Sequence, residues 1–197
     1  MTFKLGLTGS IGMGKSTTAK MFAQEGCAVW DADAAVHRLY SKGGAAVAPM
    51  GAAFPSAIVE GSVSRDALRE IIGNDPSALQ TIEAIVHPLL GTDRASFIAE
   101  TNKAILVFDI PLLFETGGDE RMDAVVCVFT DADTQRSRVL ERSTMSEAQF
   151  EQILAKQMPI DEKRTKSDYE IDTDTLEHAR AQVLAVIEDI KGKIANA

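Results

Sequence analysis

The sequence is poor in cysteine and has no long apolar run, and each absence narrows its class. Only two cysteines, Cys27 and Cys127, occur among 197 residues, and each stands alone in an apolar stretch. They offer neither a disulfide framework nor the spacing of a zinc site, so we expect buried, reduced thiols in a cytoplasmic protein. The apolar runs are far shorter than a membrane span, and the first residues lack the pattern of a signal peptide. We therefore expect no membrane association.

Positive charge is also scarce. Lysine and arginine number 20 against 29 aspartates and glutamates, which gives a net charge of −9 and a pI near 4.8. No segment is strongly basic, which argues against binding of a long nucleic acid by phosphate neutralisation. A small polyanion remains a suitable ligand, because a local cluster of donors and a divalent cation can bind it on an acidic protein.

Short apolar runs alternate with helical patterns along most of the chain. Continuous runs rich in valine, isoleucine and leucine between helices are typical of a parallel sheet covered on both faces. This alternation of apolar runs and helical patterns therefore favours an α/β fold with a parallel five-stranded sheet. The strands are predicted at residues 3–8, 27–30, 105–108, 124–129 and 169–171, and the helices around them at 15–25, 31–41, about 132–142 and about 175–193.

The interval 42–103 has no strand pattern. Helical stretches are predicted at 65–73, 76–86 and 88–101, with Asp75-Pro76 starting the second and His87-Pro88 breaking it from the third. The interval is too long for a simple crossover, so we expect a helical insert that carries a second-substrate site. An extended crossover without such a site is the alternative.

Residues 9–17 read Gly-Ser-Ile-Gly-Met-Gly-Lys-Ser-Thr and match the phosphate-loop pattern G-x-x-x-x-G-K-[ST]. Glycines let successive backbone N–H groups face phosphate oxygens, and the helix that follows adds its positive end. Lysine supplies a mobile charge, and the serine hydroxyl is a ligand for Mg²⁺. The predicted nucleotide-binding residues are Gly9, Gly12, Met13, Gly14, Lys15, Ser16 and Thr17.

Carboxylates follow two of the predicted strands. Asp31 and Asp33 come after the strand at 27–30, and Asp109 comes after the strand at 105–108. The carboxyl ends of parallel strands meet at the edge where ligands bind. Asp33 is therefore a candidate general base, and Asp109 is a candidate to organise Mg²⁺ and water. The alternative is that these aspartates cap a helix or end a strand without any catalytic role.

A GTPase switch is disfavoured, because Asn102-Lys103 is followed by Ala-Ile and lacks the aspartate of the guanine-binding motif Asn-Lys-x-Asp. A small kinase fits better. Gln135, Arg138 and Arg142 share one face of a predicted helix, and two guanidinium groups beside a lid would neutralise a phosphoryl group in transit. Residues 143–168, which include Lys163, would form the lid. A solvated helix face is the alternative interpretation.

Taken in order, these motifs resemble those of the dephospho-coenzyme A kinase family over nearly the whole chain. The family often has Ile-x-Asn-x-Gly near the adenine, where this chain has Ile-Asp-Thr-Asp at 171–174. The resemblance rests on the loop at 6–17, Asp-Ala-Asp at 31–33, His-Pro at 87–88, Asp-Ile-Pro-Leu-Leu-Phe-Glu at 109–115, Gln-x-x-Arg-x-x-x-Arg at 135–142, and Gln-Met-Pro at 157–159 with Lys163.

The resemblance implies ATP and Mg²⁺ as cofactors and transfer of the γ-phosphate to the ribose 3′-hydroxyl of dephospho-coenzyme A. Asp33 would be the general base, Lys15 and the loop amides would hold ATP, and Arg138 and Arg142 would steady the phosphates. Magnesium would bind Ser16 together with a strand-end carboxylate, for which Asp109 is the candidate and Asp31 and Asp33 are the alternatives. The implied substrate-binding residues are Thr8, Asp33, His87, Leu112 and Leu113.

The family fold implied for residues 1–197 is a single P-loop NTPase-like domain of three layers. Its parts would be a core at 1–31, 104–142 and 169–197, a helical substrate region at 32–103, and a lid at 143–168. We expect a monomer or small homo-oligomer. Two alternatives remain: a nucleoside or nucleoside-monophosphate kinase, and a nucleotide-dependent regulatory protein with negligible turnover.

Overall fold

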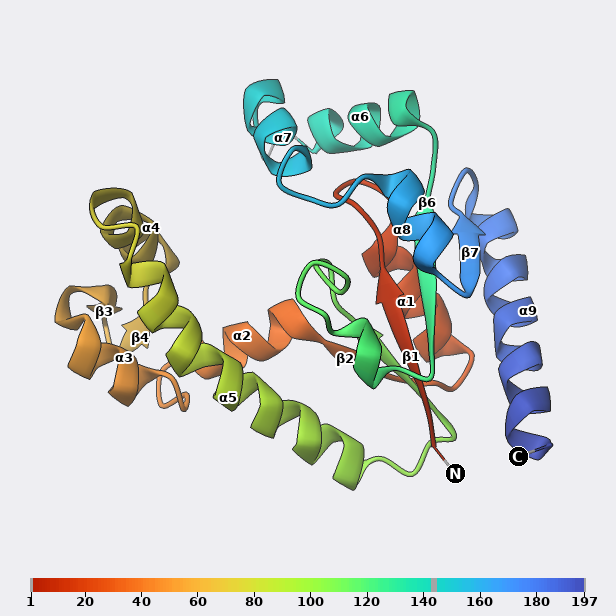
Figure 1. The fold of residues 1–197 in the computed structure, drawn as a ribbon, viewed down its shortest axis with the longest axis horizontal. Helices are drawn as coiled ribbons and strands as arrows, with labels where there is room; N and C mark the ends of the chain where they lie inside the picture. The colour runs from red at the N-terminus through yellow and green to blue at the C-terminus, as the bar shows by residue number, and fades with distance from the viewer. Residues whose placement is uncertain (1, 143–144, 197) are drawn as a thin grey trace. The chain divides into compact units, whose positions relative to one another are not determined.

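The computed structural model describes residues 2–142 and 145–196 (Figure 1). The chain divides into two compact units, of which the first comprises Met1–Trp30 and Asn102–Ala197 and the second comprises Asp31–Thr101. The predicted lid begins with Ser143 and Thr144, which lie outside the described residues. Among the residues that are described, no helix is both long enough and apolar enough to cross a membrane.

A five-stranded sheet forms the centre of the first unit, and its strand order is β2-β5-β1-β6-β7. The pairs β1–β5, β1–β6 and β6–β7 are parallel, so the predicted fold class is confirmed. Each of the five predicted strands is present within one residue of its expected ends. Their bounds are β1 Phe3–Thr8, β2 Ala28–Asp31, β5 Ile105–Asp109, β6 Ala124–Phe129 and β7 Tyr169–Asp172.

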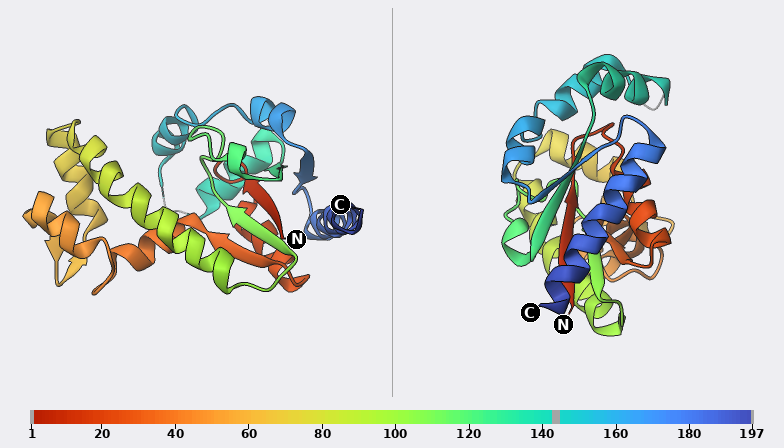
Figure 2. Two further views of the ribbon diagram at one scale, coloured as in Figure 1. Left: turned by 60° about the horizontal axis from the view of Figure 1, so that its bottom comes forward. Right: turned by 90° about the vertical axis from the view of Figure 1, so that its right-hand side faces the viewer.

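Helices α1 (Lys15–Gln24) and α9 (Leu176–Ala195) pack against each other on one face of this sheet (Figure 2, right). Leu5 and Leu7 of β1 point to this face and join the buried core there. Gly6, between them, points the other way, where a Cβ atom would come within 2.7 Å of Leu113. The loop that follows β5 therefore covers the second face, and α8 (Ile160–Lys166) packs on β6 beside it. Because β1 and β5 are adjacent and parallel, their carboxyl ends lie side by side at one edge of the sheet.

Local capping fixes where several helices start. Asp131 accepts a hydrogen bond from the Thr134 amide at the start of α6 (Ala132–Glu141). Ser146 and Gln149 form a capping box at the start of α7 (Glu147–Leu154). Thr175 caps α9. A short 3-10 helix, η2 (Asp119–Arg121), lies between β5 and β6.

The second unit has its own hydrophobic core, which includes Leu39, Met50, Leu68 and Val86. The Arg38 guanidinium of α2 also pairs with the carboxylate of Asp93 on α5, with a shortest N–O distance of 2.7 Å. The elements of this unit are α2 Ala32–Tyr40, α3 Val47–Ala53, η1 Pro55–Ala57, β3 Ile58–Val59, β4 Ser62–Val63, α4 Arg65–Asn74 and α5 Ala78–Glu100.

Three predictions for this region are wrong. The interval was expected to have no strands, but β3 and β4 form an antiparallel hairpin whose turn contains Glu60 with φ 53° and Gly61 with φ 82°. The strands are too short for the alternating pattern that identifies a strand from sequence. A break was expected at Pro88, but α5 continues through it. The apolar residues Val86, Leu89 and Leu90 pack into the core on both sides of the proline, and that burial outweighs its local cost of about 3 kcal/mol.

The predicted start of the same helix at Asp75-Pro76 is also wrong, because α5 begins at Ala78. The Asp75 carboxylate accepts hydrogen bonds from both the amide and the hydroxyl of Ser77. Such a turn, closed by the aspartate's own side chain, competes with helical structure. It delays the helix by two residues.

Candidate active site

The phosphate loop joins the end of the central strand β1 to the start of α1. Gly12 has φ 79° and Gly14 has φ 85°, a left-handed conformation that favours glycine. Helix α1 follows directly from Gly14, and the first N–H groups of a helix have no partners within it. The residues predicted to bind a nucleotide therefore lie on a loop and helix terminus suited to anions.

Lys15 and Asp109 form an ion pair beside this loop. Lys15 is the first residue of α1, and its Nζ contacts Oδ1 of Asp109, the last residue of β5. The Asp109 carboxylate is nearly inaccessible, with a side-chain exposure of 3%. Ser16, in the first turn of α1, is exposed. The structure thus brings two of the predicted phosphate and metal ligands into direct contact, at the carboxyl edge of the sheet.

Side chains from distant parts of the chain hold the middle of the loop. The Ile11 amide donates to Oε1 of Gln157 at 3.0 Å, and the Ile11 carbonyl accepts from Nε2 of Gln135 at 2.7 Å. The Thr173 hydroxyl donates to the Met13 carbonyl at 2.9 Å. The sequence marks Gln135 and Gln157 as motif positions, but it does not predict that they contact the loop.

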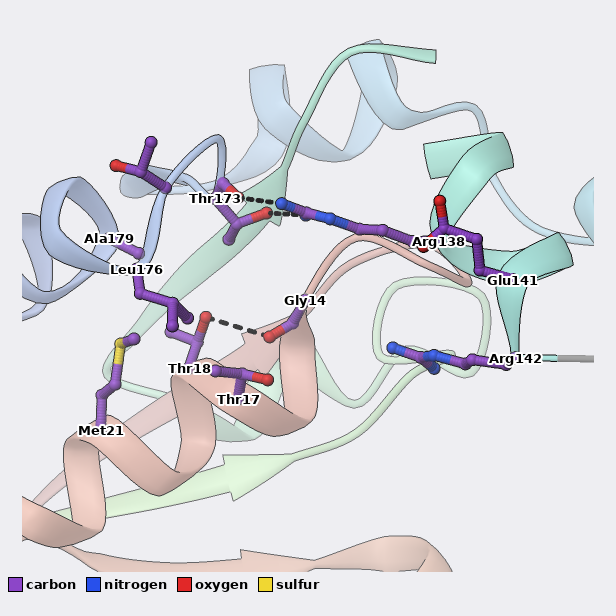
Figure 3. Close-up of a pocket in the computed structure, with 11 residues that line it drawn as sticks. Gly14, Thr17, Thr18, Met21, Arg138, Glu141, Arg142, Thr173, Leu176 and Ala179 are labelled. Carbon is purple, nitrogen blue, oxygen red and sulfur yellow. Dashed lines mark hydrogen bonds between the residues drawn. The ribbon is translucent and has the colours of Figure 1, made fainter. Parts of the chain in front are cut away.

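A cavity of about 350 Å³ opens beside Gly14, between α1, α6 and the connection from β7 to α9 (Figure 3). Its walls combine apolar and charged groups. Leu176, which is 70% exposed, is one of the apolar residues of the wall. The lining residues are Gly14, Thr17, Thr18, Met21, Arg138, Glu141, Arg142, Thr173, Thr175, Leu176 and Ala179. The sequence did not predict this cavity, apart from the adenine contacts expected around residues 171–174.

Arg138 and Arg142 both extend toward this cavity from α6 and its end (Figure 3). The Arg138 guanidinium donates to the Thr173 hydroxyl at 3.0 Å and to the Thr173 carbonyl at 2.6 Å. Because the same hydroxyl contacts Met13, Thr173 links the guanidinium to the phosphate loop. Arg142 is exposed at the C-terminal end of α6. Both side chains therefore place positive charge beside the N-terminus of α1.

The loop after β5 carries Leu112 and Leu113, two of the residues predicted for substrate binding, and contacts a third, Thr8 of β1. The Thr8 hydroxyl is buried and donates to the Pro111 carbonyl at 3.1 Å. Leu113 is fully buried against the sheet, whereas Leu112 is 42% exposed. Leu112 therefore offers apolar surface to a ligand, and Thr8 and Leu113 fix the backbone of the loop.

A buried lysine anchors the same loop. Lys163 of α8 is fully buried, and its Nζ lies 2.9 Å from both the Pro111 carbonyl and Oε1 of Glu115. Glu115 also accepts from the Met158 amide at 2.8 Å. Burial acts to raise the pKa of Glu115, but the hydrogen bonds from Lys163 and Met158 outweigh it and lower the pKa below 4.5. The carboxylate is therefore ionised and paired with the ammonium group.

The remaining predicted residues belong to the second unit. Asp31 caps α2 by accepting a hydrogen bond from the Ala34 amide at 2.9 Å. Asp33 lies in the first turn of α2, two residues beyond the end of β2, and its side chain is exposed. His87 is exposed on α5. The alternative interpretation of Asp31 as a helix cap is thus correct, while Asp33 remains available for chemistry.

Comparison with known proteins yields consistent matches. The family model described as dephospho-CoA kinase matches residues 3–178. A dephospho-CoA kinase of Ruegeria pomeroyi is 66% identical over 191 residues, which are 97% of each chain. Among solved structures, TT1252 of Thermus thermophilus matches with a TM-score of 0.87 and 28% identity, over 95% of this chain and 97% of that one. Dephospho-CoA kinase of Campylobacter jejuni matches with a TM-score of 0.71 and 26% identity, over 98% and 100%.

Proposed function

The chain belongs to the dephospho-CoA kinase family, and from this we propose how its residues transfer the γ-phosphoryl group of ATP to the ribose 3′-hydroxyl of dephospho-CoA. The chain is an ATP-dependent kinase of coenzyme A synthesis. The observation that carries the residue roles is the cavity at the N-terminus of α1, directly beside the phosphate loop. A single nucleoside triphosphate can occupy both places, with its phosphates at the phosphate loop and its base in the cavity.

ATP binds with its phosphates against the loop amides and its adenine in the cavity. A cavity of about 350 Å³ is at the small end of the range for ligand sites, which suits a nucleoside rather than a larger group. Leu176, Met21 and Ala179 supply the apolar surface against which a planar base packs. The α1 N-terminus and Lys15 then face the phosphates.

Lys15 changes partners when the triphosphate binds. Its ammonium group pairs with Asp109 in the structure, and a phosphate oxygen is a competing anion within reach of a flexible side chain. Release of the Asp109 carboxylate leaves it and the Ser16 hydroxyl as hard oxygen donors, the ligand type that Mg²⁺ prefers. The residues therefore fit Mg²⁺, which would supply neutralisation of the phosphate charge when bound.

Two arginines stabilise the transferring group. Arg138 is oriented by its hydrogen bonds to Thr173, so little rearrangement is needed to direct its charge at the phosphates. Arg142 is exposed at the start of the predicted lid, 143–168. We assign this segment to covering the phosphates during transfer, when water must be excluded.

Asp33 removes the proton from the acceptor hydroxyl. Its carboxylate is exposed at the start of α2, and the neighbouring Asp31 has a different task as the cap of that helix. We assign the region 32–103, with His87, to binding dephospho-CoA, and Leu112 to its apolar part. Thr8 and Leu113 support Leu112 through the loop contacts described above.

Cellular context is part of the proposal. Cys27 and Cys127 are free and buried, as expected in a reducing compartment, so we propose a cytoplasmic enzyme. The acidic surface charge disfavours nucleic acid, and the partner we propose is the small-molecule substrate, bound by a monomer or small homo-oligomer.

The first test measures ADP release from Mg·ATP with dephospho-CoA, AMP, adenosine or no acceptor. We expect release with dephospho-CoA well above the other three, and coenzyme A as the product. Release only with AMP or adenosine would identify a nucleoside or nucleotide kinase, and no release above background would favour a regulatory protein.

The second test separates the two neighbouring aspartates. Asp33→Asn should lower kcat by about 10² to 10⁴, the usual contribution of general-base catalysis, with little change in ATP binding. Asp31→Asn is the matched control, because asparagine also caps helices and costs little at that position. Normal turnover by Asp33→Asn would reject its assignment as the base.

A further inference from the structure

The peptide groups at the crest of the phosphate loop are bound on both sides by glutamine side chains. The Ile11 amide is held by Gln157 and the Ile11 carbonyl by Gln135. The backbone partners define the two side-chain orientations, because an N–H group needs an acceptor oxygen and a carbonyl needs a donor nitrogen. Gln157 therefore acts as an acceptor and Gln135 as a donor, at opposite ends of one residue.

Gln135 reaches the loop from α6. The residue is buried, with 4% exposure, and its backbone and side chain pack against the next loop residue. A Cβ atom on Gly12 would lie 3.0 Å from the Gln135 carbonyl oxygen and 3.2 Å from its Cγ. The contact between α6 and the loop is thus tightly packed, and this packing holds Gln135 in place.

Gln157 reaches the loop from the connection between α7 and α8. The next residue, Met158, donates its amide to Glu115, and Glu115 is paired with the buried Lys163 of α8. Gln157 therefore extends from a backbone segment that is anchored one residue away. This chain of contacts ties the Ile11 amide to the loop after β5 through fixed groups.

We propose that Gln135 and Gln157 are positioning residues that hold the phosphate loop in its nucleotide-binding shape before the nucleotide arrives. The inference rests on the proposed function, since it assigns the loop to the β- and γ-phosphates of ATP. Because Ile11 is held from both sides, the nucleotide does not have to order the loop when it binds. The entropic cost of binding is therefore lower and the affinity for the nucleotide is higher. Loss of either contact should weaken nucleotide binding about threefold to tenfold, as for one hydrogen bond.

The experiment compares leucine and glutamate variants at both positions. Gln157→Leu and Gln135→Leu each remove one contact with Ile11. Gln157→Glu keeps an acceptor oxygen, whereas Gln135→Glu loses the donor, and both add the same negative charge near the loop. The exposed Gln152 of α7 provides the control Gln152→Leu. Affinity for Mg·ADP is measured by isothermal titration calorimetry, and amide hydrogen exchange of Ile11 by NMR on the nucleotide-free protein.

We expect weaker ADP binding in both leucine variants and in Gln135→Glu, with Gln157→Glu nearer to the unmodified protein and Gln152→Leu unchanged. The Ile11 amide should exchange about tenfold faster in Gln157→Leu, because a local opening no longer has to break that bond. Equal losses in the two glutamate variants would assign the effect to charge and overturn the proposal. So would unchanged ADP affinity and unchanged Ile11 exchange in Gln157→Leu, which alters a partly exposed side chain and should fold.

Neither readout needs the acceptor substrate. A chain that fails to phosphorylate dephospho-CoA but shows these changes in ADP affinity and Ile11 exchange would refute the proposed function and support the role of the two glutamines. Normal kinase activity without these changes would support the proposed function and refute the role of the two glutamines.

Discussion

The substitution Lys163→Met removes a fully buried ammonium group and leaves the carboxylate of Glu115 without its charged partner. The Lys163 side chain is 0% exposed and that of Glu115 is 18% exposed. Removing one member of a buried ion pair costs about 3 to 5 kcal/mol. The residual solvent access of Glu115 places the expected loss at the lower end, about 3 kcal/mol. For a chain of this length, that corresponds to a fall in Tm of about 6 to 12 °C.

A double variant tests whether the unpaired charge is the cause. Lys163→Met combined with Glu115→Gln removes both charges of this pair, and the glutamine oxygen still accepts from the Met158 amide. The double variant should therefore be more stable than Lys163→Met alone, although methionine cannot replace the hydrogen bond to Pro111. Non-additivity of the two changes measures the coupling between the side chains.

The loss should also depend on pH. The lowered pKa of Glu115 means that the pair stabilises the fold above pH 4.5 and that this contribution is lost as pH falls through the folded-state pKa. In Lys163→Met, burial remains without the ammonium group, so the pKa of Glu115 rises and the carboxyl becomes neutral at a higher pH. The stability difference should thus be larger at pH 7.5 than at pH 5.5. Urea unfolding followed by circular dichroism measures it, and an equal difference at both pH values, or a double variant less stable than Lys163→Met, would refute the reasoning.

Two further predictions concern the site, and a third concerns the buried cysteines. Thr173→Val removes the hydroxyl that orients Arg138 and should lower kcat/KM for ATP about threefold to tenfold; unchanged steady-state kinetics would contradict this. Leu176→Ser removes apolar surface from the cavity and should raise the KM for ATP with little effect on kcat, which an ATP titration at saturating acceptor checks. Burial raises the pKa of Cys27 to about 11 and of Cys127 to about 12, so at pH 8 a thiol reagent should react only after unfolding; rapid reaction of the folded protein would show the thiols to be accessible. The ordinary pKa of a cysteine thiol is 9.0. Because these thiols stay protonated in the folded state, their contribution to stability should decline as pH rises above that value.

The sheet and the phosphate loop were predictable because their signals are local. A buried parallel strand needs a continuous apolar run, and β1 and β6 occupy the predicted residues 3–8 and 124–129. The loop is defined by glycines at fixed spacing before a lysine. The same local rules failed in the second unit. There, Pro88 lies inside α5, and the hairpin strands of two residues each are too short to show an alternating pattern. There, packing of side chains into the core outweighs local preference.

The site was predictable only in part, for a related reason. Lys15, Ser16 and Asp109 follow from a motif and a strand end. The cavity wall at Leu176 and the role of Thr173 could not be derived, because they depend on how the connection from β7 to α9 meets the N-terminus of α1. The motif at 157–159 gave a signal for Gln157, but only as a member of a family pattern.

The groups from which the chemistry was inferred are therefore readable in the amino-acid sequence: a phosphate loop, a lysine, strand-end carboxylates and two arginines, each recognisable from neighbours a few residues away. The contacts that hold these groups in place are visible only in the folded chain. Ile11 and Gln157 are separated by 146 positions, and Met13 and Thr173 by 160. Contacts at such separations leave no periodic trace in the sequence, since they arise only when the sheet has assembled and brings the two segments to the same edge.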